Sequence, residues 1–404
     1  MNCRFCSTKL ENVFVDLINS PASNSYLSQE QLNEPETFYP LKIYVCESCK
    51  LVQIDEYKKS DDIFDKDYAY FSSFSTSWLA HAKAYVEMIT HKLDLNTDSL
   101  VTEIASNDGY LLQYFKEINI PCIGIEPTAS TAKVAKEKGI IVIEDFFGYT
   151  LAEKIEKSDL ILGNNVLAHV PDINDFVKGL KKALKESGTI TMEFPHLLNI
   201  IKENQFDTIY HEHFSYLSFY TVEQVFKTQG LKIYHVEKLP THGGSLRIYA
   251  THNENELQIC NDSVDKMIEE ERVFGLLEMD IYKNFQEKAD KVKYDLIQFL
   301  IDAKNNNKKV VAYGAAAKGN TLLNYAGIKN DLIQFVVDKS PYKQNKYLPA
   351  SHIPIVDEDE IKVFSPDYIL ILPWNIKDEV IDQLSYTREW DCKFVVAVPE
   401  LHII

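Results

Sequence analysis

The stretch LVTEIASNDG, residues 100–109, decides the fold of this 404-residue chain. A short apolar run typical of a buried strand ends in an acidic residue, small residues and a glycine, and a helical pattern follows from Tyr110. Small residues let a ligand approach the backbone closely, and open α/β sheets bind their ligands at the carboxyl edge of the strands. The stretch therefore predicts the first strand and the ligand loop of a wound sheet.

Strand-like and helix-like segments alternate on both sides of this stretch. A helix is expected at Trp78–Leu93, and Phe206–Thr251 is expected to form loops and strands. Alternation of this kind is typical of a parallel sheet covered by helices, which is an α/β, Rossmann-like fold. The expected strands are Leu100–Ala105, Ile120–Glu126, Ile140–Ile143, Leu160–Asn164 and Gly188–Phe194, and the expected helices are Tyr110–Ile118, Ser130–Lys138, Leu151–Lys157 and Ile173–Leu184.

Three domains are expected along the chain. Residues 1–67 are irregular and rich in turn formers, whereas the charged, proline-free segment 262–304 predicts one or two long helices that link domains. The stretch KKVVAYGAAAKGN, residues 308–320, then begins a second strand–glycine–helix unit. We expect a small zinc domain at 1–75, a Rossmann-like domain at 76–255, and linker helices with a smaller Rossmann-like domain at 256–404.

Four of the seven cysteines predict a zinc site. Two Cys-x-x-Cys pairs let four thiolates surround one ion, which is the closed tetrahedral arrangement of structural rather than catalytic zinc. A chain in a reducing compartment favours metal over disulfides for such a pattern. The expected ligands are Cys3, Cys6, Cys46 and Cys49.

Polar residues at successive strand ends predict a nucleotide-type cofactor. Glu126 ends the second expected strand about 20 residues after the first loop, as an acid that binds ribose hydroxyls does. Asp145 and Phe146 follow the third strand, where they can flank an adenine. These residue types fit either NAD or S-adenosylmethionine. The predicted cofactor contacts are Glu103, Ala105, Asn107, Gly109, Glu126, Pro127, Asp145, Phe146, Asn164 and Asn165.

A second cluster, Tyr210-His211-Glu212-His213, predicts acid–base chemistry. A neutral histidine is a suitable base near pH 7, and a tyrosine hydroxyl can donate a hydrogen bond to a developing enolate. The spacing does not match the HExxH metal motif. His169 follows the fourth strand and is expected to face the same cleft, or else to be a structural histidine.

Two further features carry open alternatives. Tyr70 precedes the first helix, where it can line a pocket or only cap the helix. The turn from Gly314 to Asn320 includes Lys318 and leads into a helix N-terminus, so it can hold a diphosphate or only pack helix against sheet.

Composition excludes some classes of partner. The formal net charge of −18 opposes nucleic-acid phosphates, so no nucleic-acid partner is expected. No apolar run approaches the roughly 18 residues of a membrane span, and the N-terminus lacks the apolar core of a signal peptide. We therefore expect a cytoplasmic protein without membrane contact, and a monomer.

Taken in order, the motifs resemble the three-domain sugar C-3 methyltransferases of deoxysugar pathways. The resemblance spans essentially the whole chain and rests on the two CxxC pairs, EIASNDGYLL, GIEP, NNVLAHVPD, YHEHFSYLSFYT, HGGSLR and YGAAAKGN. It implies structural zinc in the first domain, S-adenosylmethionine in the second, and a nucleotide-linked 4-ketosugar held with the help of the third. dTDP is the common handle in that family, GDP and CDP remain open, and so does the substituent at C-3.

The resemblance also implies roles for single residues. His213 is implied as the base that removes the C-3 proton, so that the enolate attacks the methyl group, with Tyr210 and Glu212 supporting the base and the ketone oxygen. His169 and Tyr70 are implied to line the pocket, and the expected substrate contacts are His211, Gly314, Lys318 and Asn320. The main alternative is an NAD-dependent nucleotide-sugar oxidoreductase, although the first loop lacks G-x-G-x-x-G. A non-catalytic zinc-ribbon assembly protein is a second alternative.

Overall fold

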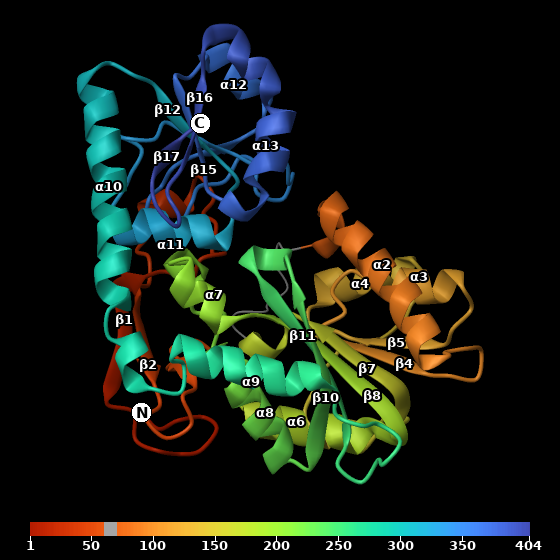
Figure 1. The fold of residues 1–404 in the computed structure, drawn as a ribbon. Helices are drawn as coiled ribbons and strands as arrows, with labels where there is room; N and C mark the ends of the chain where they lie inside the picture. The colour runs from red at the N-terminus through yellow and green to blue at the C-terminus, as the bar shows by residue number, and fades with distance from the viewer. Residues whose placement is uncertain (60–70) are drawn as a thin grey trace.

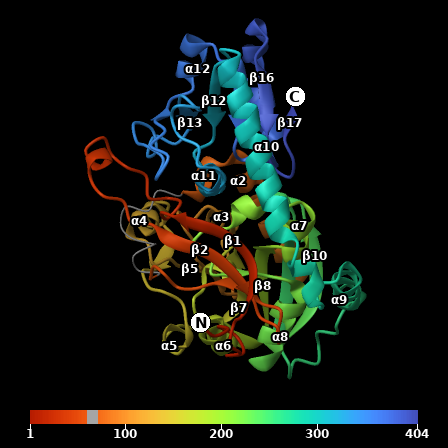
Figure 2. The same ribbon diagram turned by 90° about the vertical axis from the view of Figure 1, so that its left-hand side faces the viewer.

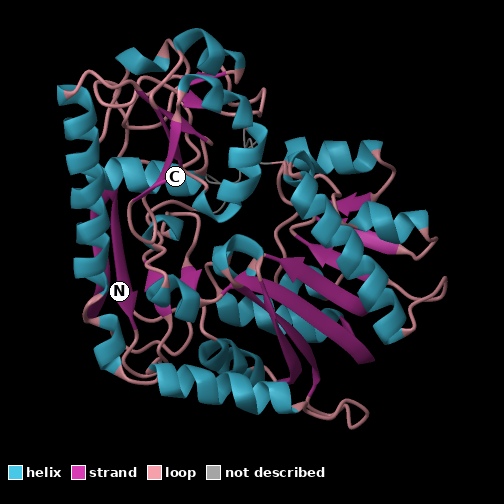
Figure 3. Ribbon diagram, turned by 45° about the horizontal axis from the view of Figure 1, so that its top comes forward, coloured by secondary structure: helices cyan, strands magenta, loops and turns pink. Residues whose placement is uncertain are grey.

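The computed structural model describes residues 1–59 and 71–404. Its described part contains three sheets, which lie in the N-terminal, middle and C-terminal parts of the molecule (Figure 1). Helices cover both faces of the largest sheet (Figure 3). None of the helices in the described ranges combines the length and the apolar character that crossing a membrane requires.

The N-terminal sheet has the strand order β1-β2-β3-β9 and is antiparallel. Its fourth strand comes from the middle of the chain, because Val52 of β3 pairs with Tyr216 of β9. The long strands β1 and β2 differ from the irregular structure expected at residues 1–67. Register shifts between Val13 and Val15 and between Asp16 and Asn19 break the alternation that would have indicated a strand. The strands are β1 (Asn12–Ser20), β2 (Tyr39–Val45), β3 (Val52–Ile54) and β9 (Ser215–Tyr216).

The middle sheet has the order β10-β11-β8-β7-β4-β5-β6. The five strands from β8 to β6 are parallel, whereas β11 and β10 are antiparallel additions. This confirms the five strands expected from the sequence. The strands are β4 (Val101–Ile104), β5 (Cys122–Ile125), β6 (Ile141–Ile143), β7 (Ser158–Asn164), β8 (Leu184–Pro195), β10 (Leu231–Leu239) and β11 (Ser245–His252).

Helices cover this sheet on two faces because alternate residues of a strand point to opposite sides. In β7, Leu160 and Leu162 join the core under α2 and α3, whereas Ile161 joins the core under α6 and α8. The chain order reverses between β4 and β7, which creates a switch point at the carboxyl edge. The helices are α2 (Thr76–Leu93), α3 (Leu112–Glu117), α4 (Ala129–Glu137), α5 (Tyr149–Ala152), α6 (Ile173–Ala183), α7 (Leu197–Lys202) and α8 (Phe219–Thr228).

Two sequence-based expectations were wrong in this region. Helix α8 lies in Phe206–Thr251, where only loops and strands were expected, and α5 spans four residues instead of the seven expected at Leu151–Lys157.

The C-terminal sheet has the order β14-β13-β12-β15-β16-β17 and is parallel apart from β17. Strand β12 begins the strand–glycine–helix unit expected at residues 308–320. The elements are β12 (Val310–Tyr313), α11 (Ala317–Ala326), β13 (Val336–Val337), β14 (Ile355–Val356), α12 (Asp359–Phe364), β15 (Tyr368–Ile371), α13 (Lys377–Gln383), β16 (Lys393–Val396) and β17 (His402–Ile403).

Two helices link the domains, as the charged segment 262–304 predicted. They are α9 (Asp262–Phe274) and α10 (Phe285–Asn305). Figure 2 shows α10 running from the N-terminal sheet up to the C-terminal domain. At its start the Phe285 ring stacks on Phe14 of β1, with the ring centroids 4.4 Å apart. The N-terminal and C-terminal domains therefore share one hydrophobic core.

Candidate active site

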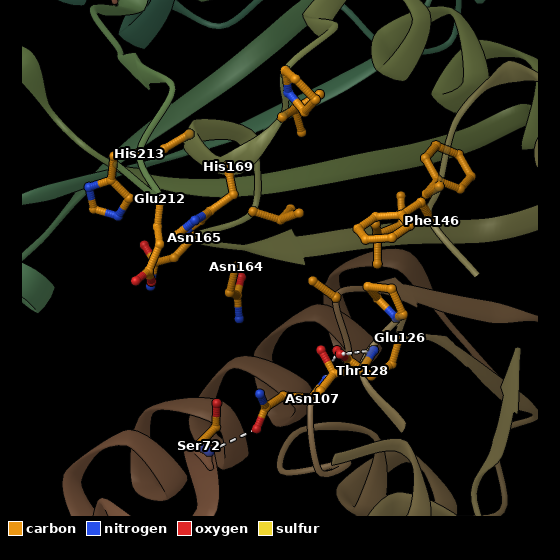
Figure 4. Close-up of a pocket in the computed structure, with 18 of the residues that line it drawn as sticks. Ser72, Asn107, Glu126, Thr128, Phe146, Asn164, Asn165, His169, Glu212 and His213 are labelled. Carbon is orange, nitrogen blue, oxygen red and sulfur yellow. Dashed lines mark hydrogen bonds between the residues drawn. The ribbon is translucent and has the colours of Figure 1, made fainter. Parts of the chain in front are cut away.

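A cavity of about 670 Å³ lies at the carboxyl edge of the middle sheet, where all three domains meet. Asn24 of the N-terminal domain and Lys318 and Lys343 of the C-terminal domain line it together with residues of the middle domain. Figure 4 shows two groups of side chains with Asn164 between them. One group is His169, Glu212, His213 and Asn165, and the other is Asn107, Glu126, Thr128 and Phe146.

The conformation of the loop after β4 is fixed by hydrogen bonds to Glu126, which follows β5. One oxygen of Glu126 accepts the backbone N–H of Asn107 at 2.9 Å, and the other accepts that of Thr128 at 2.9 Å. Asn107 has a φ of 50°, a conformation that asparagine tolerates better than most residues. Its side-chain oxygen accepts the N–H of Ser72 at 2.9 Å. The carboxylate of Glu126 thus shapes the loop and also lines the cavity.

Two predicted cofactor residues lie behind this loop rather than on the cavity surface. Glu103 is fully buried, and burial raises its pKa well above the ordinary value while the Tyr110 hydroxyl opposes the rise. Gly109 has a φ of 74°, and a Cβ there would come within 2.4 Å of Ile140 Cδ1. Both residues support the loop from below, and neither lines the cavity.

The other predicted cofactor residues line one continuous wall. This wall is built from the ends of β4 to β7, as the strand-end pattern predicted. Asn164 donates from its amide to the Tyr110 hydroxyl at 3.3 Å, and Asn165 has a φ of 57°. The lining residues are Ala105, Asn107, Glu126, Pro127, Asp145, Phe146, Asn164 and Asn165.

The group of side chains that contains His213 centres on a hydrogen-bonded tyrosine–histidine pair. Nδ1 of His213 lies 3.0 Å from the carbonyl oxygen of Thr208, and its Nε2 lies 2.9 Å from the Tyr210 hydroxyl. A carbonyl can only accept, so Nδ1 carries the proton and Nε2 of the neutral ring accepts from Tyr210. Burial, and then the nearby His169, lower the pKa of His213 well below its ordinary value. The ring is therefore neutral, and its Nε2 lone pair accepts the Tyr210 hydroxyl.

His169 packs edge-on against this imidazole. The two ring centroids lie 4.6 Å apart with the rings at 71°. Burial lowers the pKa of His169 to about 4, so this ring is also neutral near pH 7. The two neutral histidines can stay close without charge repulsion.

Glu212 faces the N-terminal domain. Its two carboxylate oxygens accept from the Asn24 side-chain amide, each at 2.8 Å. Burial raises the pKa of Glu212 to about 7, although the hydrogen bond from Asn24 opposes the rise. A carboxyl group with a pKa near neutrality beside a neutral histidine is typical of acid–base sites.

Several predicted site residues lie away from the cavity. His211 turns to β2 and donates from Nε2 to the Pro40 carbonyl at 3.2 Å. Asn320 donates to the Ser23 carbonyl at 2.6 Å, and a Cβ at Gly314 would come within 2.5 Å of Pro373. None of the three lines the cavity, whereas Lys318 does. Tyr70 lies outside the described residues.

Some lining residues were not predicted from the sequence. His242, in the HGGSLR motif, has a φ of 53° and meets Trp78 edge-on, with the ring centroids 4.9 Å apart. Burial lowers its pKa to about 4. The adjacent glycine pair was the available signal, because it marks a tight turn whose first residue can project into a site. Nothing in the local sequence marked Asn24 or Lys343.

The four paired cysteines form a separate cluster. Cys3 Sγ lies 3.5 Å from Cys49 Sγ, and Cys6 Sγ lies 3.5 Å from Cys46 Sγ. All four sulfurs lie within 4.8 Å of one another. Four sulfurs at about 2.3 Å from a zinc ion are separated by about 3.8 Å in a tetrahedron, so the cluster fits one zinc ion. Each pair closes a knuckle turn, with Ser7 N–H on the Cys3 carbonyl and Lys50 N–H on the Cys46 carbonyl, both at 2.9 Å.

Comparisons with known proteins cover the whole chain. Residues 3–64 match a family of zinc binding domains, residues 79–236 a methyltransferase domain family, and residues 240–399 the C-methyltransferase C-terminal domain. The C-methyltransferase NovU of Streptomyces niveus is 31% identical over 406 residues, which cover 100% of this chain and 96% of NovU.

Solved structures also resemble part of the chain. Magnesium protoporphyrin IX methyltransferase from Synechocystis PCC 6803, with bound S-adenosylhomocysteine, has a TM-score of 0.36 at 14% identity, covering 43% of this chain and 83% of that enzyme. A methyltransferase from Thermotoga maritima has a TM-score of 0.34 at 18% identity, covering 44% of this chain and 94% of that one.

These matches decide between the alternatives that the residue types left open. The methyltransferase match selects S-adenosylmethionine as the cofactor, in place of the NAD of an oxidoreductase, and excludes the non-catalytic zinc-ribbon alternative. The zinc binding match agrees with the geometry of the four cysteines. The chain belongs to the family of three-domain, S-adenosylmethionine-dependent C-methyltransferases with a zinc-binding N-terminal domain.

Proposed function

We propose that this C-methyltransferase adds a methyl group to C-3 of a nucleotide-linked 4-keto-deoxysugar, with His213 as the base. The observation that carries the proposal is the hydrogen-bonded pair of Tyr210 and neutral His213, which shares one cavity with the loop after β4. The sugar class rests on the resemblance of the ordered motifs to the sugar C-3 methyltransferases.

The cofactor is proposed to bind along the wall formed by the ends of β4 to β7. Ala105 and Asn107 would face its methionine part, Glu126 its ribose, and Asp145 with Phe146 its adenine. Asn164 and Asn165 would then face the sulfonium, and Asn164 lies between the two groups of side chains seen in Figure 4. When bound, S-adenosylmethionine supplies an electrophilic methyl group.

The protein's own residues would generate the nucleophile. The C-4 ketone acidifies the proton on C-3, and Nε2 of His213 would take that proton while the C–H electron pair becomes the enolate. The Tyr210 hydroxyl would turn from Nε2 to the ketone oxygen as the substrate enters, and its hydrogen bond would stabilise the enolate oxygen. The enolate carbon would then form the new C–C bond to the methyl group while the methyl–sulfur bond breaks and S-adenosylhomocysteine leaves, and the proton on His213 would pass to solvent.

Lysines of the C-terminal domain are proposed to attract the diphosphate. Lys318 and Lys343 both line the cavity. The chain carries a formal net charge of −18, so an anionic substrate needs such a local cationic wall. Gly314 and Asn320, which were predicted as substrate contacts, are not required for this arrangement.

A mass-spectrometric screen of nucleotide 4-ketosugars tests the proposed function. We expect a gain of one methyl group on at least one dTDP-, GDP- or CDP-linked 4-ketosugar. The matched 4-hydroxy sugar should stay unmodified, because its C-3 proton lacks an adjacent ketone. If no 4-ketosugar is methylated while a ketone without a nucleotide is, the assigned substrate class is wrong.

Glu126→Ala is expected to weaken cofactor binding by about ten- to a hundredfold, since a hydrogen bond to a charged group contributes about 1.5–3 kcal/mol. The variant also removes the acceptor for the Asn107 and Thr128 N–H groups, so the loop loses its shape as well. Calorimetry with S-adenosylhomocysteine measures the change. Glu144→Ala is the matched control, because this nearby exposed carboxylate pairs with Lys136 outside the cavity. Unchanged affinity in Glu126→Ala would place the ribose elsewhere.

A further inference from the structure

Asn24 reaches the catalytic cluster from the N-terminal domain, 188 residues before Glu212 in the sequence. Its side-chain nitrogen lies 2.8 Å from both carboxylate oxygens of Glu212. Within the described ranges, no other side chain donates a hydrogen bond to this buried carboxylate. The zinc-bearing domain therefore contributes directly to the group of residues around His213.

The amide of Asn24 is held in one orientation. The nitrogen must face Glu212, because the amide oxygen would repel a carboxylate. The oxygen faces the Tyr26 hydroxyl at 3.2 Å, and that hydroxyl also lies 2.6 Å from the Ala315 carbonyl. The C-terminal domain thus supports Asn24 through Tyr26.

Helix α11 holds both sides of this contact through two adjacent residues. Asn320 donates to the carbonyl of Ser23, the residue before Asn24, at 2.6 Å. Thr321 donates to the carbonyl of Ile209, the residue before Tyr210, at 2.8 Å. Both side chains are buried. The hydrogen bonds form a closed circuit that runs from α11 through Asn24 and Glu212 to the Tyr210–His213 loop and back to α11.

We propose that Asn24 is a positioning residue of the active site, which fixes the Glu212 carboxylate beside His213. Asn320 and Thr321 hold the backbone before Asn24 and before Tyr210, and so keep Asn24 and Glu212 in contact. The proposal rests on the proposed function for the chemistry that it supports. It assigns the GAAAKGN turn a second role, as a clamp between domains. It also gives the N-terminal domain a part in catalysis besides zinc binding.

The charge state of Glu212 gives the proposal a distinctive signature. Burial raises the pKa of Glu212 to about 7, and the hydrogen bond from Asn24 lowers it. Removing that donor therefore raises the pKa further, so the ionised carboxylate is lost at a higher pH. The other groups around it are the neutral rings of His169 and His213 and, from the N-terminal domain, Tyr26 and Lys58.

The experiment compares the full-length Asn24→Leu variant with the unmodified full-length enzyme. The measurement is the rate of methyl transfer to the acceptor found in the screen. We expect kcat to fall about tenfold or more, and the acidic limb of the kcat profile to move up by about 1–2 pH units, as expected for loss of a hydrogen bond to a charged group. Zinc content and affinity for S-adenosylhomocysteine should stay unchanged. Asn33→Leu, an exposed asparagine of the same domain, is the matched control.

Two further variants separate positioning from a general loss of structure. Thr321→Val keeps the shape of the side chain and should lower kcat without moving the acidic limb, because it leaves the bond between Asn24 and Glu212 in place. In a Glu212→Gln background, Asn24→Leu should cost much less than it does alone, since contacting residues are not additive. An unshifted acidic limb in Asn24→Leu, or an equal loss in both backgrounds, would overturn the proposal.

A stability measurement distinguishes this proposal from the proposed substrate. The coupling between Asn24 and Glu212 in the free energy of unfolding needs no acceptor, and we expect it to be larger at pH 8 than at pH 5. If the screen finds no sugar acceptor but this coupling is present, the substrate class fails while the contact stands. If the coupling is absent at both pH values, the positioning role fails whatever the acceptor is.

Discussion

Replacing His213 with asparagine is expected to lower the rate of methyl transfer by about 10²–10⁴, the range that a general base contributes. Asparagine preserves a polar side chain but has no lone pair of comparable basicity at the position of Nε2. Both ligands should still bind, because His213 is held by Thr208 and Tyr210 and not by the cofactor loop. The loss should therefore appear in kcat while both binding constants change little.

Exchange of the C-3 proton provides a second measurement. If the native enzyme exchanges this proton with deuterated water in the absence of a methyl donor, His213→Asn should slow that exchange as well. Tyr210→Phe should cost less, because water can replace part of a hydroxyl's hydrogen bond to the ketone oxygen. A base defect and a methyl-transfer defect are separated in this way.

His211→Asn is the matched control for this prediction. His211 lies in the same motif but donates to the Pro40 carbonyl and does not line the cavity. Its replacement should leave turnover near normal. Near-normal turnover in His213→Asn, with a collapse in His169→Asn or His211→Asn, would move the base to another histidine and leave the C-methyltransferase assignment intact.

The parallel core of the molecule was predictable because its strands are buried on both faces. Such strands read as short apolar runs that end in glycines and polar residues, and LVTEIASNDG and VVAYG are both of this kind. Carboxyl ends of parallel strands meet at one edge, so residues far apart in sequence, such as Asn107 and Asn164, could be placed together. The same reasoning could not separate the residues on the cavity surface from Glu103, which lies beneath the loop.

Helix α8 was missed although its signals are present. Phe219, Val222 and Val225 are buried on one face, and Ser218 caps the helix by accepting the Thr221 N–H at 3.1 Å. Aromatic and β-branched residues favour strands locally, and here packing against the sheet overrides that preference. Strand β1 was missed for a different reason, because its bulges interrupt the alternation of buried and exposed residues that indicates a strand.

The parts of the site that depend on long-range contacts could not be predicted. Spacing alone does not show that His213 faces the cavity while His211 faces β2, since the loop turns between them. The position of Asn24 in the active site depends on its contact with α11 and on the pairing of β3 with β9. These contacts join segments of all three domains. No local pattern records such contacts, and they become visible only when the domains are packed together.

Cys46→Ser is expected to remove the zinc ion and to destabilise the N-terminal domain by several kcal/mol, because binding of a structural zinc contributes about 10–16 kcal/mol in zinc-finger peptides. A serine hydroxyl is not deprotonated at neutral pH and is a much weaker ligand than a thiolate. Metal analysis should find one zinc per chain in the native protein and little in the variant. Thermal unfolding should show the loss of stability. Cys260→Ser is the matched control, because Cys260 is exposed and lies outside the cluster.

Loss of zinc should also lower catalysis, because the two Cys-x-x-Cys turns are hydrogen-bonded to the middle domain. Thr221 of α8 donates to the Cys49 carbonyl at 3.1 Å, and Asn174 of α6 donates to the Phe5 carbonyl at 2.9 Å. Beyond the second knuckle, β3 pairs with β9, which begins two residues after His213. Loss of zinc should therefore loosen the Tyr210–His213 loop and lower kcat, while S-adenosylhomocysteine still binds at the opposite wall. Freshly prepared native protein without zinc, or a Cys46→Ser variant with unchanged stability and kcat, would refute this coupling.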